Sequence, residues 1–173
     1  MSPRRQRGAT LVVGLILLSL VTLLGLAGAS TAHVEQQLAQ NEQFRENAAS
    51  AASTGIEIAI RNIVNSADPA AVPAAIREFV PGATDRFETT TRFVGFEFAL
   101  PQLAGEPLAG AHFEILSTGY SVRRAVDRQR ANVMLVVPSP DGAPQPCEPE
   151  IPGRHCHAPG ELVRLSWQRV VPD

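Results

Sequence analysis

Hydrophobic positions dominate the start of the chain, where the 21 residues from Ala9 to Ala29 carry no charge. As a helix rising about 1.5 Å per residue, this stretch would be about 30 Å long, the thickness of a bilayer core. Arginines precede it and only His33 and Glu35 follow closely, so the positive-inside rule puts the N-terminus in the cytoplasm. We predict a single membrane span. A secretory signal cut after residues 27–29 is the alternative, which the length of the run disfavours.

Past this run, apolar residues recur at helical spacing through residues 30–66, a segment without proline. Polar residues separate them, which indicates an amphipathic helix that continues the first one. The apolar stripe consists of Val34, Leu38, Ala48, Ala52, Ile56, Ile60 and Ile63. Interior glycines cost about 1 kcal/mol each relative to alanine in a helix, so we expect local bending or melting where they occur. They are Gly14, Gly25, Gly28 and Gly55.

Beyond Ser66 the elements become shorter. Asp68 and Pro69 have the character of an N-cap and a first helical residue, and they predict a short helix that ends before Pro81. The apolar face of that helix would be Val72, Ile76, Phe79 and Val80. Four runs rich in β-branched and aromatic residues follow, at residues 86–98, 112–122, 130–137 and 161–171.

The four β-like runs predict a small antiparallel sheet. The first changes its apolar face near Phe93, and Gly95 beside the change indicates a bulge. The second and third are close enough in sequence to form a hairpin across the polar residues 123–129. In the fourth, apolar residues up to Trp167 alternate with polar ones, so we interpret Trp167 and the phenylalanines as core. A helix laid across such a sheet buries both apolar faces, and the predicted fold class is α+β.

Charge and composition argue against several kinds of chemistry. Beyond Gly8, 12 arginines face 17 acidic residues, a formal charge of −5, so nothing indicates a nucleic-acid partner. The chain has no Gly-rich phosphate loop, no G-x-S-x-G and no histidine pair at metal-binding helix spacing. We therefore predict that the protein is not an enzyme and has no cofactor and no metal. The carboxylates Glu88, Glu97, Glu106 and Glu114 are scattered through the presumed strands and loops.

Residues 137–160 form a loop rich in proline and glycine that contains both cysteines, Cys147 and Cys156. If the body lies outside the cytoplasm, the two most simply form a disulfide, worth about 2 to 3 kcal/mol. The alternative is a metal site built from these cysteines with His155 and His157. It has suitable ligand types but lacks a C-x-x-C or H-x-x-x-H framework. We favour the disulfide, and the loop is also a candidate contact surface.

A family resemblance follows from the order of features in the first 63 residues. RQRGATLVVGLILLSLVTLLGLAGAS, followed by QQLAQNEQFRENAASAASTGIEIAIRN, resembles the PilX-like minor pilins of the type IV pilus. The resemblance implies that prepilin peptidase cuts between Gly8 and Ala9 and methylates the new N-terminus at Ala9. It also implies a pilin architecture. The chain is then a leader at 1–8, a membrane-spanning and assembly half of the helix at 9–29, an amphipathic periplasmic half at 30–66, and a globular head at 67–173.

Two residues depart from the pilin pattern. Major pilins have a glutamate at mature position five, where this chain has Val13, and the alanine-rich helix usually has a glutamate where this chain has Ser53. The first glutamate is thought to pair with the N-terminal ammonium of a neighbouring subunit in an apolar filament core, where an unpaired charge is expensive. The resemblance thus implies an accessory subunit at or near the filament tip. Val13, Gly14, Gly25 and Gly28 are the expected helix-packing positions.

The partners implied by the resemblance are other minor pilins, the major pilin, a tip adhesin, the inner-membrane assembly platform and prepilin peptidase. The expected location is the inner membrane with a periplasmic head, and the extracellular pilus after assembly. A minor pseudopilin of type II secretion is one alternative, because it shares the leader and the fold. A membrane-anchored periplasmic binding or sensor domain whose anchor is never processed is the other.

Overall fold

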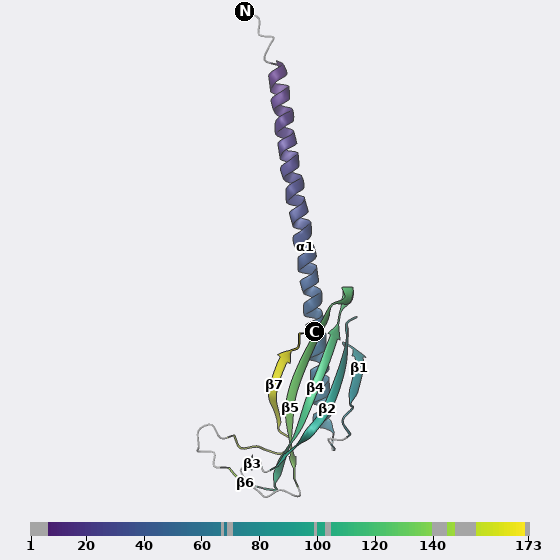
Figure 1. Cartoon of the computed structure of the whole chain (residues 1–173), viewed down its shortest axis with the longest axis vertical. Coiled ribbons are helices and arrows are strands. Elements are labelled where there is room, and N and C mark those ends of the chain that lie inside the picture. Colours follow the sequence, from purple (N-terminus) through teal and green to yellow (C-terminus); the bar gives the residue numbers. More distant parts are fainter. Residues whose placement is uncertain are drawn as a thin grey trace, which may run out of the picture. The chain divides into compact units, whose positions relative to one another are not determined.

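The computed structural model of the chain describes residues 7–66, 68, 71–98, 100–102, 105–139, 145–147 and 155–171. Within the helix, the side chains of residues 7–10, 27 and 29–31 lie outside this description. The chain divides into two compact units, Met1–Gln43 and Phe44–Asp173. One helix, α1 at Arg7–Asn65, contributes residues to both units (Figure 1). Each unit is described by itself below.

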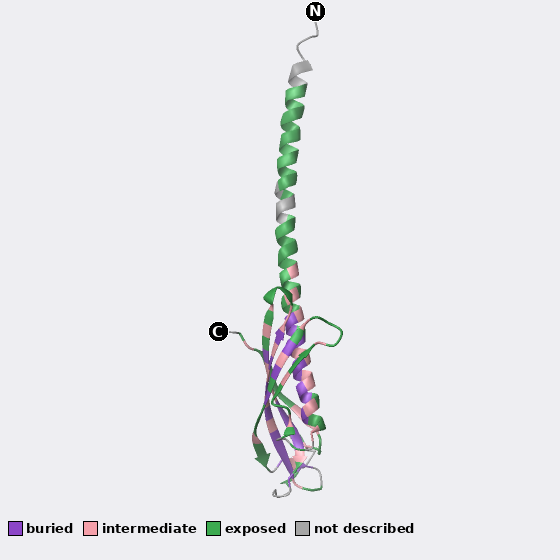
Figure 2. Ribbon diagram, turned by 90° about the vertical axis from the view of Figure 1, so that its right-hand side faces the viewer, coloured by how far each residue is buried: buried purple, intermediate pink, exposed green. Residues whose placement is uncertain are grey.

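In the first unit, α1 exposes its apolar side chains. Every large hydrophobic residue between Leu11 and Leu26 is more than half exposed (Figure 2). The hydroxyls of Ser19 and Thr22 donate to the carbonyls of Leu15 and Leu18, so these polar groups are satisfied within the helix. This part of α1 therefore presents an almost wholly apolar surface.

The membrane span predicted for Ala9–Ala29 has no support in the structure. Among the described residues, no helix combines the length and the apolar character needed to cross a membrane. Several side chains of the predicted span, those of residues 9, 10, 27 and 29, lie outside the described residues.

The second unit contains a five-stranded antiparallel sheet in the order β1-β2-β4-β5-β7. Its strands are Ala75–Phe79, Arg86–Phe98, Leu108–Tyr120, Val126–Pro138 and Leu162–Arg169. Two short strands, β3 at Pro101–Gln102 and β6 at Gln145–Pro146, form a separate parallel pair. The helix and the antiparallel sheet confirm the α+β fold class.

The C-terminal part of α1 packs on one face of this sheet, as the buried residues of the helix show in Figure 2. Alternation along β4 is strict, with odd-numbered residues buried and even-numbered ones partly exposed from Ala111 to Tyr120. The core cluster joins Ile56, Ala59, Ile60 and Ile63 of the helix to Ala111, Phe113, Ile115, Ala131, Val133 and Leu135 of β4 and β5. The apolar stripe predicted for residues 48–63 is therefore the face that builds the core.

Two glycines allow the helix and the sheet to approach closely. A Cβ added at Gly119 in β4 would collide with the backbone of Ala48 and Ala52 in α1. A Cβ added at Gly55 would meet Ser117 and Thr89, whose hydroxyls lie 2.9 Å apart under the helix. The helix continues unbroken through Gly55, so the local melting predicted as one possibility there is wrong. The glycine is needed for contact with the sheet instead.

Two other sequence predictions also fail. The short helix expected after Asp68 is replaced by β1, which pairs along the edge of β2. The phenylalanines of the sheet divide: two are buried, but the other four, like Trp167, are 38% exposed or more. Phe87 and Phe113 are buried, whereas Phe79, Phe93, Phe96, Phe98 and Trp167 are exposed. The alternation of apolar and polar residues along a strand predicts which residues share a face of the sheet. It does not predict how much of that face a helix covers, and here α1 ends at Asn65.

The strand predictions are closer to the structure. β2 coincides with the predicted run at 86–98, and its register shifts between Phe93 and Gly95 as expected. β4 and β5 form the predicted hairpin, but both strands are longer than their apolar runs. Their turn contains η2 at Val122–Arg124, where Arg123 and Arg124 have φ of 54° and 61°. Consecutive residues with positive φ are typical of the tight turns that match the twist of a hairpin.

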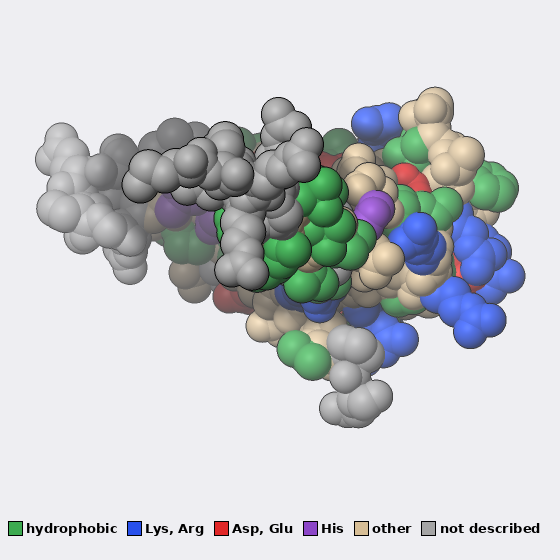
Figure 3. Space-filling model, turned by 90° about the horizontal axis from the view of Figure 1, so that it is seen from above, with side chains coloured by type: hydrophobic (Ala, Val, Ile, Leu, Met, Phe, Trp, Pro, Cys, Tyr) green, Lys and Arg blue, Asp and Glu red, His purple; other side chains and the backbone are tan. Residues whose placement is uncertain are grey.

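Arginine side chains gather on one side of the surface seen from above in Figure 3. Two arginines of the head lie over aromatic rings. The guanidinium of Arg123 is 5.5 Å from the ring centre of Phe44, and that of Arg86 is 4.7 Å from the ring centre of Tyr120. Contacts of this kind contribute about 0.5 to 1 kcal/mol at exposed sites. The first contact joins the β4–β5 turn to α1, and the second joins β2 to β4.

Candidate functional site

The predicted processing residues lie at the beginning of α1. The helix begins at Arg7, so Gly8 and Ala9 are both in its first turn. Their side chains lie outside the described residues, and the cleavage and methylation predicted there remain predictions.

The predicted packing residues of the first unit are all at the surface of α1. Val13 is 60% exposed, and a Cβ added at Gly14, Gly25 or Gly28 would meet nothing within 4 Å. Small residues on an apolar helix let a second helix approach closely. The described part of this unit thus has an apolar surface in which three glycines leave space for a second helix, and no described side chain fills that space.

Ser53, the second departure from the pilin pattern, takes part in a hydrogen-bond network in the head. Its hydroxyl lies 3.0 Å from both Gln129 Oε1 and the Ala49 carbonyl. Gln129 Nε2 donates to the Ala49 carbonyl and to Asp127, and Trp167 Nε1 donates to Gln129 Oε1 at 2.8 Å. One glutamine therefore joins α1, β5 and β7. An ionised glutamate at position 53 could not donate the hydrogen bond that Ser53 gives to Gln129 Oε1.

The loop after β5 is closed by the predicted disulfide, Cys147–Cys156, whose Cα atoms are 5.7 Å apart. The bond is anchored on both sides. Cys147 N–H donates to the Gln102 carbonyl, and the next residue after Cys156, His157, donates its N–H to the Pro101 carbonyl, each at 2.8 Å. Since both sulfurs are in the disulfide, the alternative metal site with two thiolate ligands does not form in this state.

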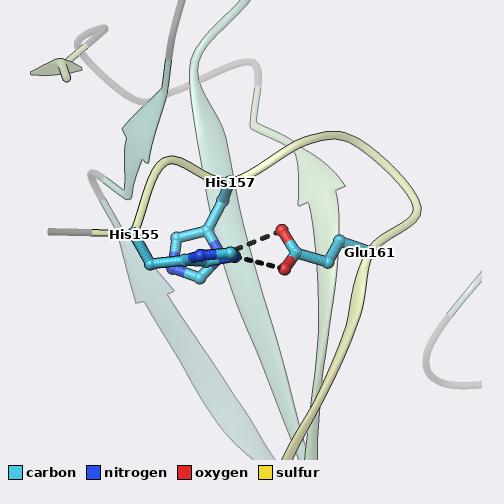
Figure 4. A group of neighbouring side chains, drawn as sticks. All are labelled: His155, His157 and Glu161. Carbon is cyan, nitrogen blue, oxygen red and sulfur yellow. Dashed lines mark hydrogen bonds and ion pairs between the residues drawn. The ribbon is translucent and has the colours of Figure 1, made fainter. Parts of the chain in front are cut away.

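Three side chains converge beside the disulfide. Figure 4 shows the imidazoles of His155 and His157 turned toward the carboxylate of Glu161. His155 Nε2 is 2.6 Å from Glu161 Oε1, and His157 Nδ1 is 3.1 Å from Glu161 Oε2. The Ala158 N–H also donates to Oε2. The hydrogen bond from His155 lowers the pKa of Glu161 below its usual range, with smaller lowering contributions from Ala158 and His157, and partial burial opposes the shift.

Sequence reasoning found only part of this cluster. His155 and His157 are ligands of the alternative metal site predicted with the cysteines, but the sequence places Glu161 only at the start of the last predicted strand, 161–171. The structure places Glu161 just before β7 at Leu162, where a turn at residues 159–160 brings its carboxylate back to the histidines. A Pro-Gly pair at those positions was the available signal, since it indicates a turn between the histidines and the glutamate.

Comparison with known proteins adds one finding. A family model described as PilX N-terminal matches residues 7–57. No curated protein and no solved structure matches the chain. The match confirms the resemblance drawn from the sequence and covers most of α1, but it covers none of the sheet.

Proposed function

We propose that this chain, whose N-terminal region is that of a PilX-like type IV pilus minor pilin, helps to initiate pilus assembly and sits at or near the pilus tip. The family is structural rather than catalytic, and its members act with other pilus components at the cell envelope. In this proposal, prepilin peptidase removes residues 1–8 and methylates Ala9. The partners are other minor pilins, the major pilin, a tip adhesin and the inner-membrane assembly platform.

The observation that carries the proposal is the apolar surface of α1 in the first unit. Its large side chains between Leu11 and Leu26 are exposed although the same helix buries its apolar face in the head. So much exposed apolar area on a helix is unfavourable in water and indicates a surface made to be covered. Helices of other pilins would cover it, and Gly14, Gly25 and Gly28 would let them approach closely.

Val13 supports the placement near the tip. Its side chain is exposed on the same apolar surface and has no charge to offer an N-terminal ammonium. If an ammonium in an apolar filament core needs a carboxylate, a subunit without one is poorly suited to positions inside the shaft. The end of the filament, where one neighbour is missing, is the position in which this lack costs least.

A localisation experiment with a matched control tests the proposal. We would express an epitope-tagged chain in its native host as wild type, Val13→Glu or Val12→Glu, shear the pili and locate the tag by immunogold labelling. Val12→Glu adds the same charge one residue away, at mature position four instead of five. We expect wild type and Val12→Glu at pilus ends and Val13→Glu also along the shaft. Wild-type label spread along the shaft, or equal behaviour of the two glutamate variants, would contradict the tip placement.

A further inference from the structure

We propose that His155, His157 and Glu161 bind a divalent transition-metal ion of the zinc class. The proposal is independent of the pilus assignment, because it rests only on the loop that precedes β7. One ligand atom from each of the three residues can be chosen so that all lie within 4.8 Å of one another. Two imidazoles and one carboxylate are a ligand set that zinc accepts, with the remaining position left to water.

The backbone around these residues is held from several directions. His155 and His157 flank Cys156, which the disulfide fixes to Cys147. His157 also pairs with Gln102, the last residue of β3. On the other side, Gly160 N–H donates to the Val136 carbonyl at 2.8 Å, and Val136 N–H donates to the Glu161 carbonyl at 2.9 Å. The three ligand positions are therefore fixed by covalent and backbone bonds that do not depend on the ligand side chains themselves.

The spacing of the three residues explains their convergence. His155 and His157 stand on either side of Cys156, and both rings face Glu161. Their ring centres are 4.8 Å apart. The turn at residues 159–160 then returns the chain so that the Glu161 carboxylate lies against both rings (Figure 4). The two histidines and the turn after them thus place three ligands on one side of the loop.

Metal binding would require shifts of about 1 Å between the ligand atoms, which now lie within 4.8 Å of one another. In a tetrahedral zinc site, bonds of about 2.0 to 2.2 Å place neighbouring ligand atoms about 3.3 to 3.6 Å apart. The nitrogen–oxygen pairs are now at 2.6 and 3.1 Å, as hydrogen bonds. Each ring N–H that points at the carboxylate would move its proton to the other ring nitrogen or to water, leaving a lone pair for the ion. The Ala158 N–H would remain as a support for Glu161 Oε2, as is usual for ligating carboxylates.

Charge and access also favour a cation. Among the described residues, the ion pairs of Glu161 are with these two histidines, and no arginine forms one with it. With neutral imidazoles the cluster has one negative charge, which a divalent ion would more than balance. The His157 side chain is 14% exposed and Glu161 27%, whereas His155 is 68% exposed. The site is therefore held on one side and open to solvent on the other, which gives the ion an entry path and room for water.

Zinc binding by the full chain tests the proposal directly. The oxidised protein in mild detergent would be dialysed against Zn²⁺, and bound zinc would be measured by mass spectrometry after a check by mass that the disulfide is intact. We expect about one zinc per chain, and a rise in melting temperature on adding zinc. Glu161→Gln and His157→Gln are expected to weaken binding by at least about tenfold and to abolish the rise.

His112→Gln is the matched control, because His112 Nε2 also lies 3.1 Å from a carboxylate, that of Glu97, but without a second histidine. This variant should bind zinc as the wild type does. Equal loss in His112→Gln, no stoichiometric zinc in the wild type, or undiminished binding in a His155→Gln/His157→Gln double variant would overturn the proposal. Each variant's unfolding without zinc, followed by Trp167 fluorescence, shows whether it is folded.

The visible spectrum of the Co²⁺ form provides a second test, since it distinguishes four-coordinate nitrogen and oxygen ligands from thiolates or hexahydrated cobalt.

Discussion

Gly119→Ala is the substitution that most sharply tests how the head is packed. Gly119 is buried in β4, and an added Cβ would point at the backbone of α1, with the carbonyl carbon of Ala48 at 3.1 Å and the Ala48 oxygen and Ala52 nitrogen closer still. Ordinary van der Waals contact begins near 3.4 Å. Because these neighbours are backbone atoms of a helix, no rotamer change can make room. The helix must move away from the sheet.

The cost follows from what that movement would disrupt. A gap of about 0.5 to 1 Å already loses a quarter to a half of the contact energy between facing atoms. The contacts at risk are those of Ile56, Ile60 and Ile63 with the sheet, the centre of the core. Overpacking usually costs about 1 to 3 kcal/mol, whereas Gly→Ala at a compatible site gains about 0.4 to 1 kcal/mol through the unfolded state. Because the clash is with backbone, we take the upper end of the overpacking cost less this gain, and we expect Gly119→Ala to lower the free energy of unfolding by about 2 kcal/mol.

Gly110→Ala is the matched control in the same strand. Its Cβ would also meet a close neighbour, but that neighbour is the flexible side chain of Met134, which can change rotamer. Urea unfolding of the full chain in detergent, followed by the fluorescence of Trp167, the only tryptophan, gives both free energies. Gly119→Ala should be less stable than Gly110→Ala by at least about 1 kcal/mol. Equal stabilities, or a Gly119→Ala protein as stable as wild type, would refute the close helix–sheet approach.

Three further predictions concern the same unit. Ile63→Ala should lower the free energy of unfolding by about 2 to 5 kcal/mol in the same urea assay, because it leaves a cavity in the core, whereas exposed Val64→Ala should change it by less than about 1 kcal/mol. Replacing both cysteines, Cys147→Ser with Cys156→Ser, should cost about 2 to 3 kcal/mol; reductant should reproduce this loss in the wild type and leave the double variant unchanged. The Arg92 hydrogen bond, opposed by burial, lowers the pKa of Glu114 below 4.5, so its stabilisation is complete above pH 4.5 and is lost as pH falls through the lowered value; a Glu114→Gln protein with the same acid dependence as wild type would contradict this.

The parts of the fold that were predictable are those in which one physical signal acts alone. The helical stripe from Ala48 to Ile63 and the strand at 86–98 with its register shift each follow from a periodicity that the structure confirms. The segment after Asp68 shows the opposite case. Its capping residues favoured a helix, but the free edge of β2 offered backbone hydrogen bonds, and residues 75–79 pair with it as β1.

The missed features depend on what lies across the fold from a residue. Helix propensity alone makes Gly55 a weak point in the helix. Its actual role depends on Thr89 and Ser117 beneath it, which are more than 30 residues away in the sequence. Phe96 and Phe98 looked like core because a strand pattern does not show where the covering helix ends. Glu161 joined the histidines only through a turn. In each case the missing information was the position of a second element, which local sequence does not contain.

The N-terminus of the mature protein is the most direct test of the central claim, that this chain is processed and assembled as a pilin. The chain would be recovered from sheared surface pili of its native host, and its N-terminal peptide identified by mass spectrometry. The account predicts N-methylated Ala9 as the first residue. A chain that is absent from pili, or that begins at Met1 or Ser30, would contradict it.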